Sequence, residues 1–82
     1  MTRSADIERL INLPFAVEVT PEERPDSAIV FMATHPELSG CKGHGAPVPD
    51  AIEDLRAATE LYVSSLVARG IEIPEPRIRR AS

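Results

Sequence analysis

Three side chains in the middle of this 82-residue chain, His35, Cys41 and His44, could bind a metal ion or supply a nucleophile and its base. Cys41 and His44 have the C-x-x-H spacing of half a zinc site, but a tetrahedral site needs four ligands and the chain has no second close-spaced pair. On one short strand these two residues would point to opposite faces, because their separation is odd, so they cannot pair as nucleophile and base. We therefore expect no metal site here. Cys41 is expected to be a small buried side chain, and both histidines are expected to lie exposed at a turn.

Other signatures of catalysis are missing from the sequence. There is no G-x-S-x-G, P-loop or G-x-G-x-x-G spacing, and Gly43-His44-Gly45 is followed by no Lys-Ser or Lys-Thr pair. Glu18 is the only acid within the two clearest predicted strands, whereas a two-metal nuclease needs several converging carboxylates. The sequence predicts a protein that is not an enzyme and that uses no cofactor.

The composition predicts one small acidic domain in a reducing compartment. Hydrophobic residues make up 43% of the chain but aromatic residues only 4%, so the core rests on Ile, Leu and Val and is close to the lower limit for folding alone. Without Arg77, Arg79 and Arg80, six basic side chains remain against thirteen acidic ones, so residues 1–76 carry a net charge of −7. The three arginines bring the net charge of the whole chain to −4. Such a body suits a cationic protein partner and disfavours direct binding of nucleic acid. A single cysteine, the lack of a leader-like apolar segment and the lack of an apolar run of about 18 residues predict a cytoplasmic protein with no membrane contact.

The N-terminal half predicts a short helix followed by a β-hairpin. The helix covers residues 4–13, with Ser4 as its cap, and Pro14 ends it because a residue before proline is pushed out of the helical region. Residues 15–19 alternate as a first strand, and residues 28–33 form a second. The apolar positions of the first strand share one face: Phe15, Val17 and Val19. The second strand is apolar on both faces, which suits either a central strand covered on both sides or half of a dimer interface.

The C-terminal half predicts a third short strand over residues 41–44 and a long amphipathic helix over residues 48–69. Pro49 suits the first turn of this helix, and Gly70 is a natural stop. The apolar stripe of the helix consists of Val48, Ile52, Leu55, Tyr62 and Leu66, flanked by Ala51, Ala58, Thr59 and Val63. Leu61 and Val67 fall outside this stripe, so they either pack against residues 71–73 or face a partner.

Several motifs occur in the order and spacing of one known family. Pro36-Glu37-Leu38-Ser39-Gly40-Cys41 forms a turn after the second strand, Gly45 precedes the long helix, and residues 70–76 read Gly-Ile-Glu-Ile-Pro-Glu-Pro. Together with Leu13-Pro14-Phe15, these motifs resemble the HicB-like antitoxin family over about residues 10–76. Pro47 stands where this family prefers a capping threonine.

The resemblance implies an α+β fold: a partial ribonuclease-H-like, three-stranded antiparallel sheet with one long helix packed on a face, plus the short N-terminal helix. It implies a non-catalytic protein that binds and neutralises a HicA-like mRNA-cleaving toxin and that forms dimers or tetramers. A single domain would span residues 1–76, with a flexible basic tail at 77–82. Because no DNA-binding domain follows, we expect no DNA binding. The alternative is an orphan homo-oligomeric scaffold or small-ligand-binding domain without a toxin partner.

The candidate partner contacts are the turn residues Glu37 and Leu38, expected to be exposed, together with Leu61 and Val67 of the long helix. Structural roles are expected for the turn and cap residues Pro36, Gly40, Cys41, Gly45 and Gly70. The N-terminal helix could pack on its own domain or on a neighbouring chain, and the Arg77–Arg80 tail leaves nucleic-acid contact as an open alternative.

Overall fold

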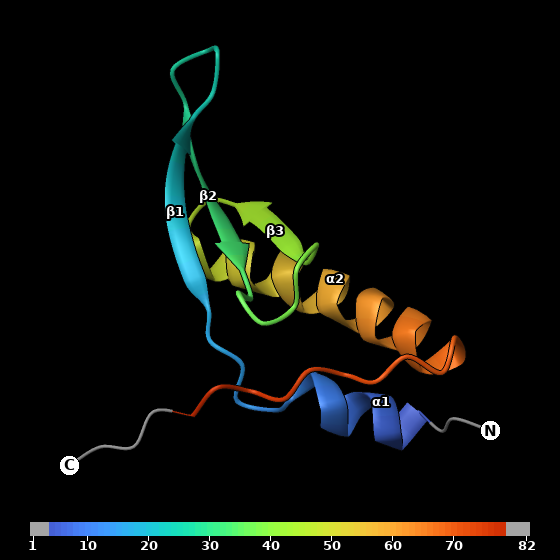
Figure 1. Cartoon of the computed structure of the whole chain (residues 1–82). Helices are drawn as coiled ribbons and strands as arrows, with labels where there is room; N and C mark the ends of the chain where they lie inside the picture. Colours follow the sequence, from blue (N-terminus) through green and yellow to red (C-terminus); the bar gives the residue numbers. More distant parts are fainter. Residues whose placement is uncertain (1–3, 79–82) are drawn as a thin grey trace.

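A short helix, three antiparallel strands and a long helix follow one another in the computed structural model, which describes residues 4–78 (Figure 1). The elements are α1 (Ser4–Ile11), β1 (Glu18–Glu23), β2 (Ile29–Thr34), β3 (Lys42–Gly45) and α2 (Val48–Ala68). The predicted α+β class and the layout of one open sheet with one long helix are confirmed. The predicted basic tail at residues 77–82 lies mostly outside the described residues.

The sheet is an antiparallel meander with β2 in the middle. Because β3 pairs only with residues 31–34, the β1–β2 hairpin extends beyond it as an arm (Figure 1). A tight turn closes the arm: the backbone N–H of Arg24 donates to the carbonyl of Ala28 (2.8 Å), and Ser27 has a positive φ of 68°. The arm is therefore two strands wide where the rest of the sheet is three.

The first strand lies further along the chain than its prediction over residues 15–19, which was wrong by several residues. Pro21, which follows the predicted end of this strand, lies within β1 opposite Phe31. Hydrogen-bonded and non-hydrogen-bonded pairs alternate along an antiparallel ladder. Arg24 is hydrogen-bonded to Ala28, so Pro21 and Phe31, three pairs further along, form a non-hydrogen-bonded pair. The nitrogen of Pro21 therefore points away from β2. Proline is tolerated there because an outward nitrogen on an edge strand needs no partner.

The long helix packs on β3 and β2 through two glycines that allow a close approach. A Cβ atom on Gly43 would lie 2.6 Å from both the Ala51 carbonyl oxygen and the Leu55 Cα. A Cβ on Gly45 would lie 2.8 Å from the Ala51 nitrogen. The helix backbone thus rests almost directly on β3, and only residues without a side chain permit that.

The buried stripe of α2 combines two residues of the predicted stripe with three of its predicted flanks. The residues that α2 buries are Ala51, Leu55, Thr59, Val63 and Leu66. Ile52, predicted to be a core residue, is 42% exposed. At about 100° per residue, Ile52 lies between the buried Thr59 and Val63 around the helix axis, so its exposure comes from its position near the start of α2 and not from the direction in which it points.

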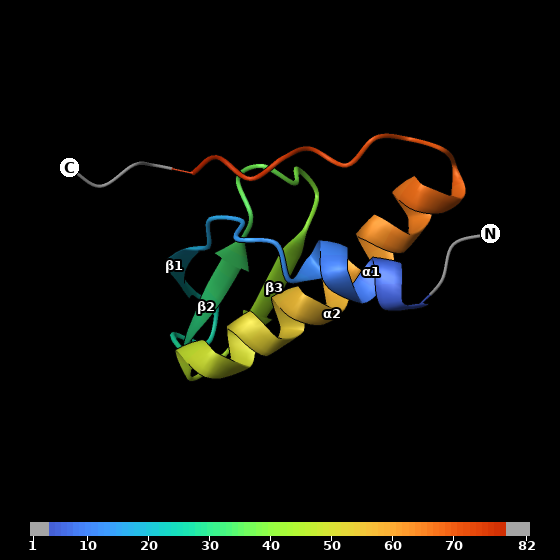
Figure 2. The same cartoon turned by 90° about the horizontal axis from the view of Figure 1, so that it is seen from below.

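The chain after α2 returns along the molecule toward the start of β1 (Figures 1 and 2). Gly70, with a φ of 70°, ends the helix as predicted, and the backbone N–H of Ile71 donates to the carbonyl of Leu66 (2.9 Å). We call residues 71–78 the C-terminal strap. Its Ile73 packs against the main core, which consists of Phe15, Ala33, Leu38, Cys41, Ala51 and Leu55.

Candidate partner-binding surfaces

The side chains with catalytic chemistry do not converge. Cys41 is 2% exposed and burial raises the pKa of its thiol, with the Thr59 hydroxyl acting weakly in the opposite sense. His44 lies exposed on β3, while Nδ1 of the half-buried His35 is 2.8 Å from the Ala16 carbonyl oxygen. Within residues 4–78 no three or more His, Cys, Asp or Glu side chains are grouped so that they could hold a metal ion. No helix in this part of the chain combines the length and apolar character needed to cross a bilayer.

Glu37 ties three segments of the chain together. Its carboxylate accepts hydrogen bonds from the backbone N–H groups of Ala16 (3.2 and 3.3 Å) and Arg77 (3.1 Å). The bond from Arg77 is the main reason that the pKa of Glu37 lies below its ordinary value. The predicted contact residue is therefore a clamp that holds the C-terminal strap against the chain before β1.

Leu38, predicted to be an exposed contact, is fully buried, so that prediction was wrong. Two consecutive turns explain its direction: the Leu38 N–H donates to the His35 carbonyl (3.0 Å), and the Cys41 N–H donates to the Leu38 carbonyl (3.1 Å). These bonds fold the turn back over the sheet and direct the leucine into the core. Gly40, with a φ of 97°, provides the left-handed residue that the reversal requires.

The two helix candidates do not share a surface. Leu61 is 75% exposed, whereas Val67 is partly buried. They are six residues apart in the sequence, and a helix turns by about 100° per residue, so their side chains point roughly 120° apart around the helix axis. Leu61 lies instead on the side of Asp54, beside the small residues Ala57 and Ser65, where it has nothing large to pack against.

A larger apolar surface lies on the helix-covered side of the sheet, and sequence reasoning missed it. Because α2 packs on β3 and β2, it leaves the same side of β1 uncovered. Four large apolar side chains there are between 38% and 49% exposed: Val17, Val19, Ile29 and Ile52. We call these four residues the helix-side patch. The sequence placed Val17 and Val19 on one face, but nothing in it indicated that the helix would stop short of them.

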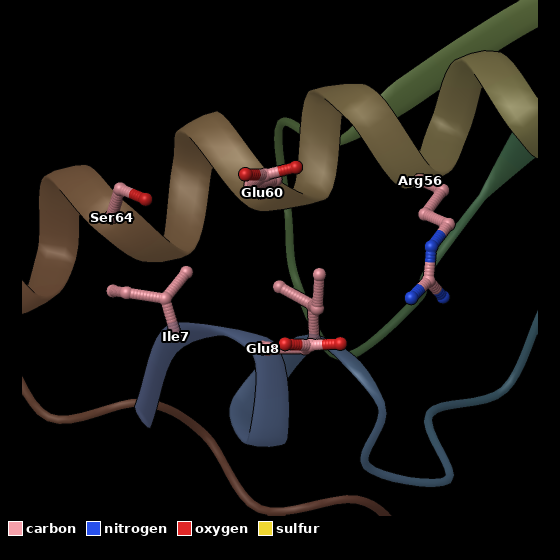
Figure 3. A pocket seen from close by; sticks show the side chains of 6 residues that line it. Ile7, Glu8, Arg56, Glu60 and Ser64 are labelled. Carbon is pink, nitrogen blue, oxygen red and sulfur yellow. The ribbon is translucent and has the colours of Figure 1, made fainter. Parts of the chain in front are cut away.

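A groove continues the helix-side patch toward α1. It has a volume of about 260 Å³, and Val17 and Ile52 line it together with Ile11 and Phe15. A second groove of about 310 Å³ separates α1 from α2, with Ile7 and Glu8 facing Glu60 and Ser64 (Figure 3). Arg56 lines both grooves. The acidic side chains around the two grooves and at the end of β1 are Glu8, Glu23, Glu53 and Glu60. The surface is thus apolar in the middle and mainly acidic at the rim.

The opposite side of the sheet carries no helix among the described elements. Along its centre run Val30, Met32 and Thr34 of β2, all half-buried. The side chains that flank them are Glu18, Thr20 and Glu22 on β1, and Lys42 and His44 on β3. We call these eight residues the open sheet face. Nε2 of His44 lies 3.2 Å from Oε1 of Glu22, so these two side chains reach toward each other across β2.

Both sheet edges are poorly suited to pairing with another strand. The outward N–H of His44 on β3 donates to the Asp54 carboxylate of α2 (2.8 Å). On β1, Pro21 removes an outward donor, and three of the six residues are glutamates. Capped donors, proline and charge are the usual protection of an edge strand. Partners are therefore expected on the faces of this domain and not at its edges.

No family model, curated protein or solved structure matches this chain. The resemblance to the HicB-like antitoxin family therefore stays a prediction.

Proposed function

We propose that this protein is a non-catalytic, antitoxin-like binding module that neutralises a basic, HicA-like mRNA-cleaving toxin. The observation that carries the proposal is the helix-side patch, an exposed apolar surface with an acidic rim. An RNA-cleaving protein must present a cationic surface to its phosphate-rich substrate, and an acidic module can cover that surface.

Inhibition in this proposal is steric and needs no chemistry from the module. Opposite charges at the rim, such as Glu23 and Glu53, speed the encounter, and burial of the apolar centre holds the complex. Val17, Val19, Ile29 and Ile52 take the place of the turn residues as the central contacts, because Leu38 is buried and the carboxylate of Glu37 is engaged within its own chain. RNA is then excluded from the toxin as long as the module stays bound.

The test begins with a pull-down of the tagged protein from its native host. We expect a small basic protein in stoichiometric amount, which cleaves RNA when purified and loses that activity when the module is added back. The module alone should degrade no RNA, with or without divalent metal ions. Recovery of the module by itself, as a stable homo-oligomer, would contradict the proposal and favour the orphan scaffold or small-ligand domain.

Matched variants locate the contact surface on the recovered toxin. Val19→Asp and Ile52→Asp place a charge inside the helix-side patch at side chains that are already partly exposed, so folding should persist. Leu61→Asp is the control, because it introduces the same charge at an equally apolar and more exposed position on another side of α2. We expect inhibition to weaken for the first two variants and to persist for the third. Equal inhibition by all three would place the contact elsewhere.

A further inference from the structure

One flank of α2 already packs beside another helix. Arg56 and Glu60 on this flank line the groove between α2 and α1 (Figure 3). One turn earlier, Ile52 lines the groove that leads to Val17, and α1 ends there at Ile11. The flank therefore has a helix beside its middle turns and an open apolar floor beside its first turns.

This floor is formed by β1 and by the part of β2 that pairs with it. Val19 and Pro21 lie on the helix side of β1, and Pro21 stands opposite the half-buried Phe31. Ile29 lies on the same side of β2 and is 49% exposed. We call the helix-side patch together with Pro21 and Phe31 the docking slot.

The dimensions of the docking slot match one helix. Residues 17–23 extend over about 20 Å, which is the length of a helix of about 13 residues. The strand β1 lies two strand spacings, about 10 Å, from β3, on which α2 packs closely. Because packed helices lie about 8–10 Å apart, a helix beside the first turns of α2 would lie over β1.

A helix suits this floor better than an extended segment does. An extended segment laid on apolar side chains would leave its backbone N–H and C=O groups without partners, whereas a helix satisfies its own. An extended segment could only pair at the free edge of β1, where Pro21 and three glutamates oppose it.

We propose that the docking slot binds one basic amphipathic helix of the partner, beside α2 and in line with α1. The identity of the partner rests on the proposed function, and the helix is the element that this partner contributes. Its apolar side chains, at i, i+4 and i+7, cover Val19, Ile29 and Ile52. Its Lys and Arg side chains lie near Glu23, at the far end of β1, and Glu53, which lines the groove on α2.

Charge favours such a partner over a helix from a second copy of this chain. The acids on the exposed side of α2 are Asp50, Glu53, Asp54 and Glu60, and the basic residue among them is Arg56. The α2 of a second copy would therefore bring like charge to Glu23 and Glu53 in the docking slot, whereas a basic helix brings opposite charge.

Synthetic helices test the slot on the isolated full chain. The probes are a panel of stapled peptides of about 14 residues, with Leu, Ile or Phe at i, i+4 and i+7 and with Lys and Arg elsewhere. We expect dissociation constants of about 10–100 μM, because one short helix buries less than a standard interface does. The methyl NMR signals of Val19, Ile29 and Ile52 should shift on binding, while those of Val30 on the open sheet face and of Leu61 should not.

Two sets of control peptides separate the shape of the helix from its charge. Peptides of the same composition, scrambled so that the apolar residues share no face, should bind at least about tenfold more weakly. Peptides with Glu in place of Lys and Arg should also bind at least about tenfold more weakly, because they carry several like charges toward the acidic rim. Equal binding of either control set would overturn the proposal.

Neighbouring variants locate the binding surface. Val19→Asp and Ile52→Asp should weaken the peptides at least about tenfold, since each buries a charge under the helix. Thr20→Asp, next along β1 but on the open sheet face, and Leu61→Asp on α2 are the controls, and both should leave binding within about twofold. These four positions are exposed, so circular dichroism should show all variants folded.

The rim acids should contribute less than the floor. Glu23→Lys and Glu53→Lys should each weaken the basic peptides about threefold, as expected for exposed ion pairs. Glu18→Lys, on the open sheet face, is the matched charge reversal and should change binding by no more than the general loss of negative charge does. Unchanged binding in both rim variants would overturn the assignment of a basic helix.

This experiment separates the slot from the proposed function. If no peptide of the panel shifts the slot signals at about 1 mM, the helix proposal is overturned even when a toxin is recovered and neutralised. If the peptides bind as expected but no toxin is recovered, the proposed function fails and the slot stands. Shifts of the same signals with protein concentration alone would show that a second copy occupies the slot, and would overturn the proposal.

Discussion

The close contact between β3 and α2 can be tested with one added methyl group. In Gly43→Ala the new Cβ would lie 2.6 Å from the Ala51 carbonyl oxygen and from the Leu55 Cα, whereas ordinary contact begins at 3.4 Å. These are backbone atoms of a packed helix, so no side-chain rotation relieves the clash. The backbone nitrogen of Leu55 would be closer still, so the helix would have to move by more than about 0.8 Å away from the strand.

Overpacking of this kind usually costs about 1–3 kcal/mol, and we expect a cost near the upper limit because backbone must move. At about 2.1 cal/mol/K per residue, the unfolding entropy of 82 residues is roughly 0.17 kcal/mol/K, so 3 kcal/mol lowers Tm by about 17 °C. Thermal unfolding followed by circular dichroism at 222 nm measures this shift directly. Complete unfolding of the variant would agree with the same reasoning in a domain of low stability.

Gly70→Ala is the matched control, since its Cβ would have no atom within 4 Å and only the φ of 70° is unfavourable for alanine. That variant should lose about 1 kcal/mol, or roughly 6 °C. If Gly43→Ala lost no more stability than Gly70→Ala, then α2 would not lie on β3 in the way described above.

Three further predictions concern the core and the turn. Leu38→Ala should cost about 2–5 kcal/mol in urea unfolding while Leu61→Ala costs less than about 0.5 kcal/mol, since only the first side chain is buried; equal costs would contradict their assignment. Because the folded-state pKa of Glu37 is lowered, its carboxylate should stabilise the folded protein fully above about pH 4.5, and this stabilisation should disappear as the pH falls through the lowered pKa. The unfolding free energy of Glu37→Gln should therefore vary less between about pH 3 and 6 than that of the wild type. Cys41, buried and with a raised pKa, should react with iodoacetamide at pH 8 at least about 100-fold more slowly than in urea; fast labelling of the native protein would show that the core opens readily.

Local signals in the sequence determined most of the elements. The long helix begins at Val48 as predicted and ends at Ala68, one residue before its predicted end, because proline in the first turn and glycine after the last residue act on the backbone directly. The second and third strands lie within one residue of their predicted ranges. The opposite directions of Cys41 and His44 followed from strand alternation, and the burial of Cys41 was predicted from its small side chain.

Only the tertiary structure decided which apolar residues are core and which are surface. Periodicity shows which residues share a face of a helix, but the glycines of β3 decided that Ala51 packs against the strand, and the position of Ile52 near the start of α2 decided that it stays exposed although it points in the same direction as the buried Thr59 and Val63. The hydrogen bonds of the turn, not its composition, directed Leu38 inward. The helix-side patch exists because one helix cannot cover three strands, a fact of width and position that no local pattern in the chain encodes.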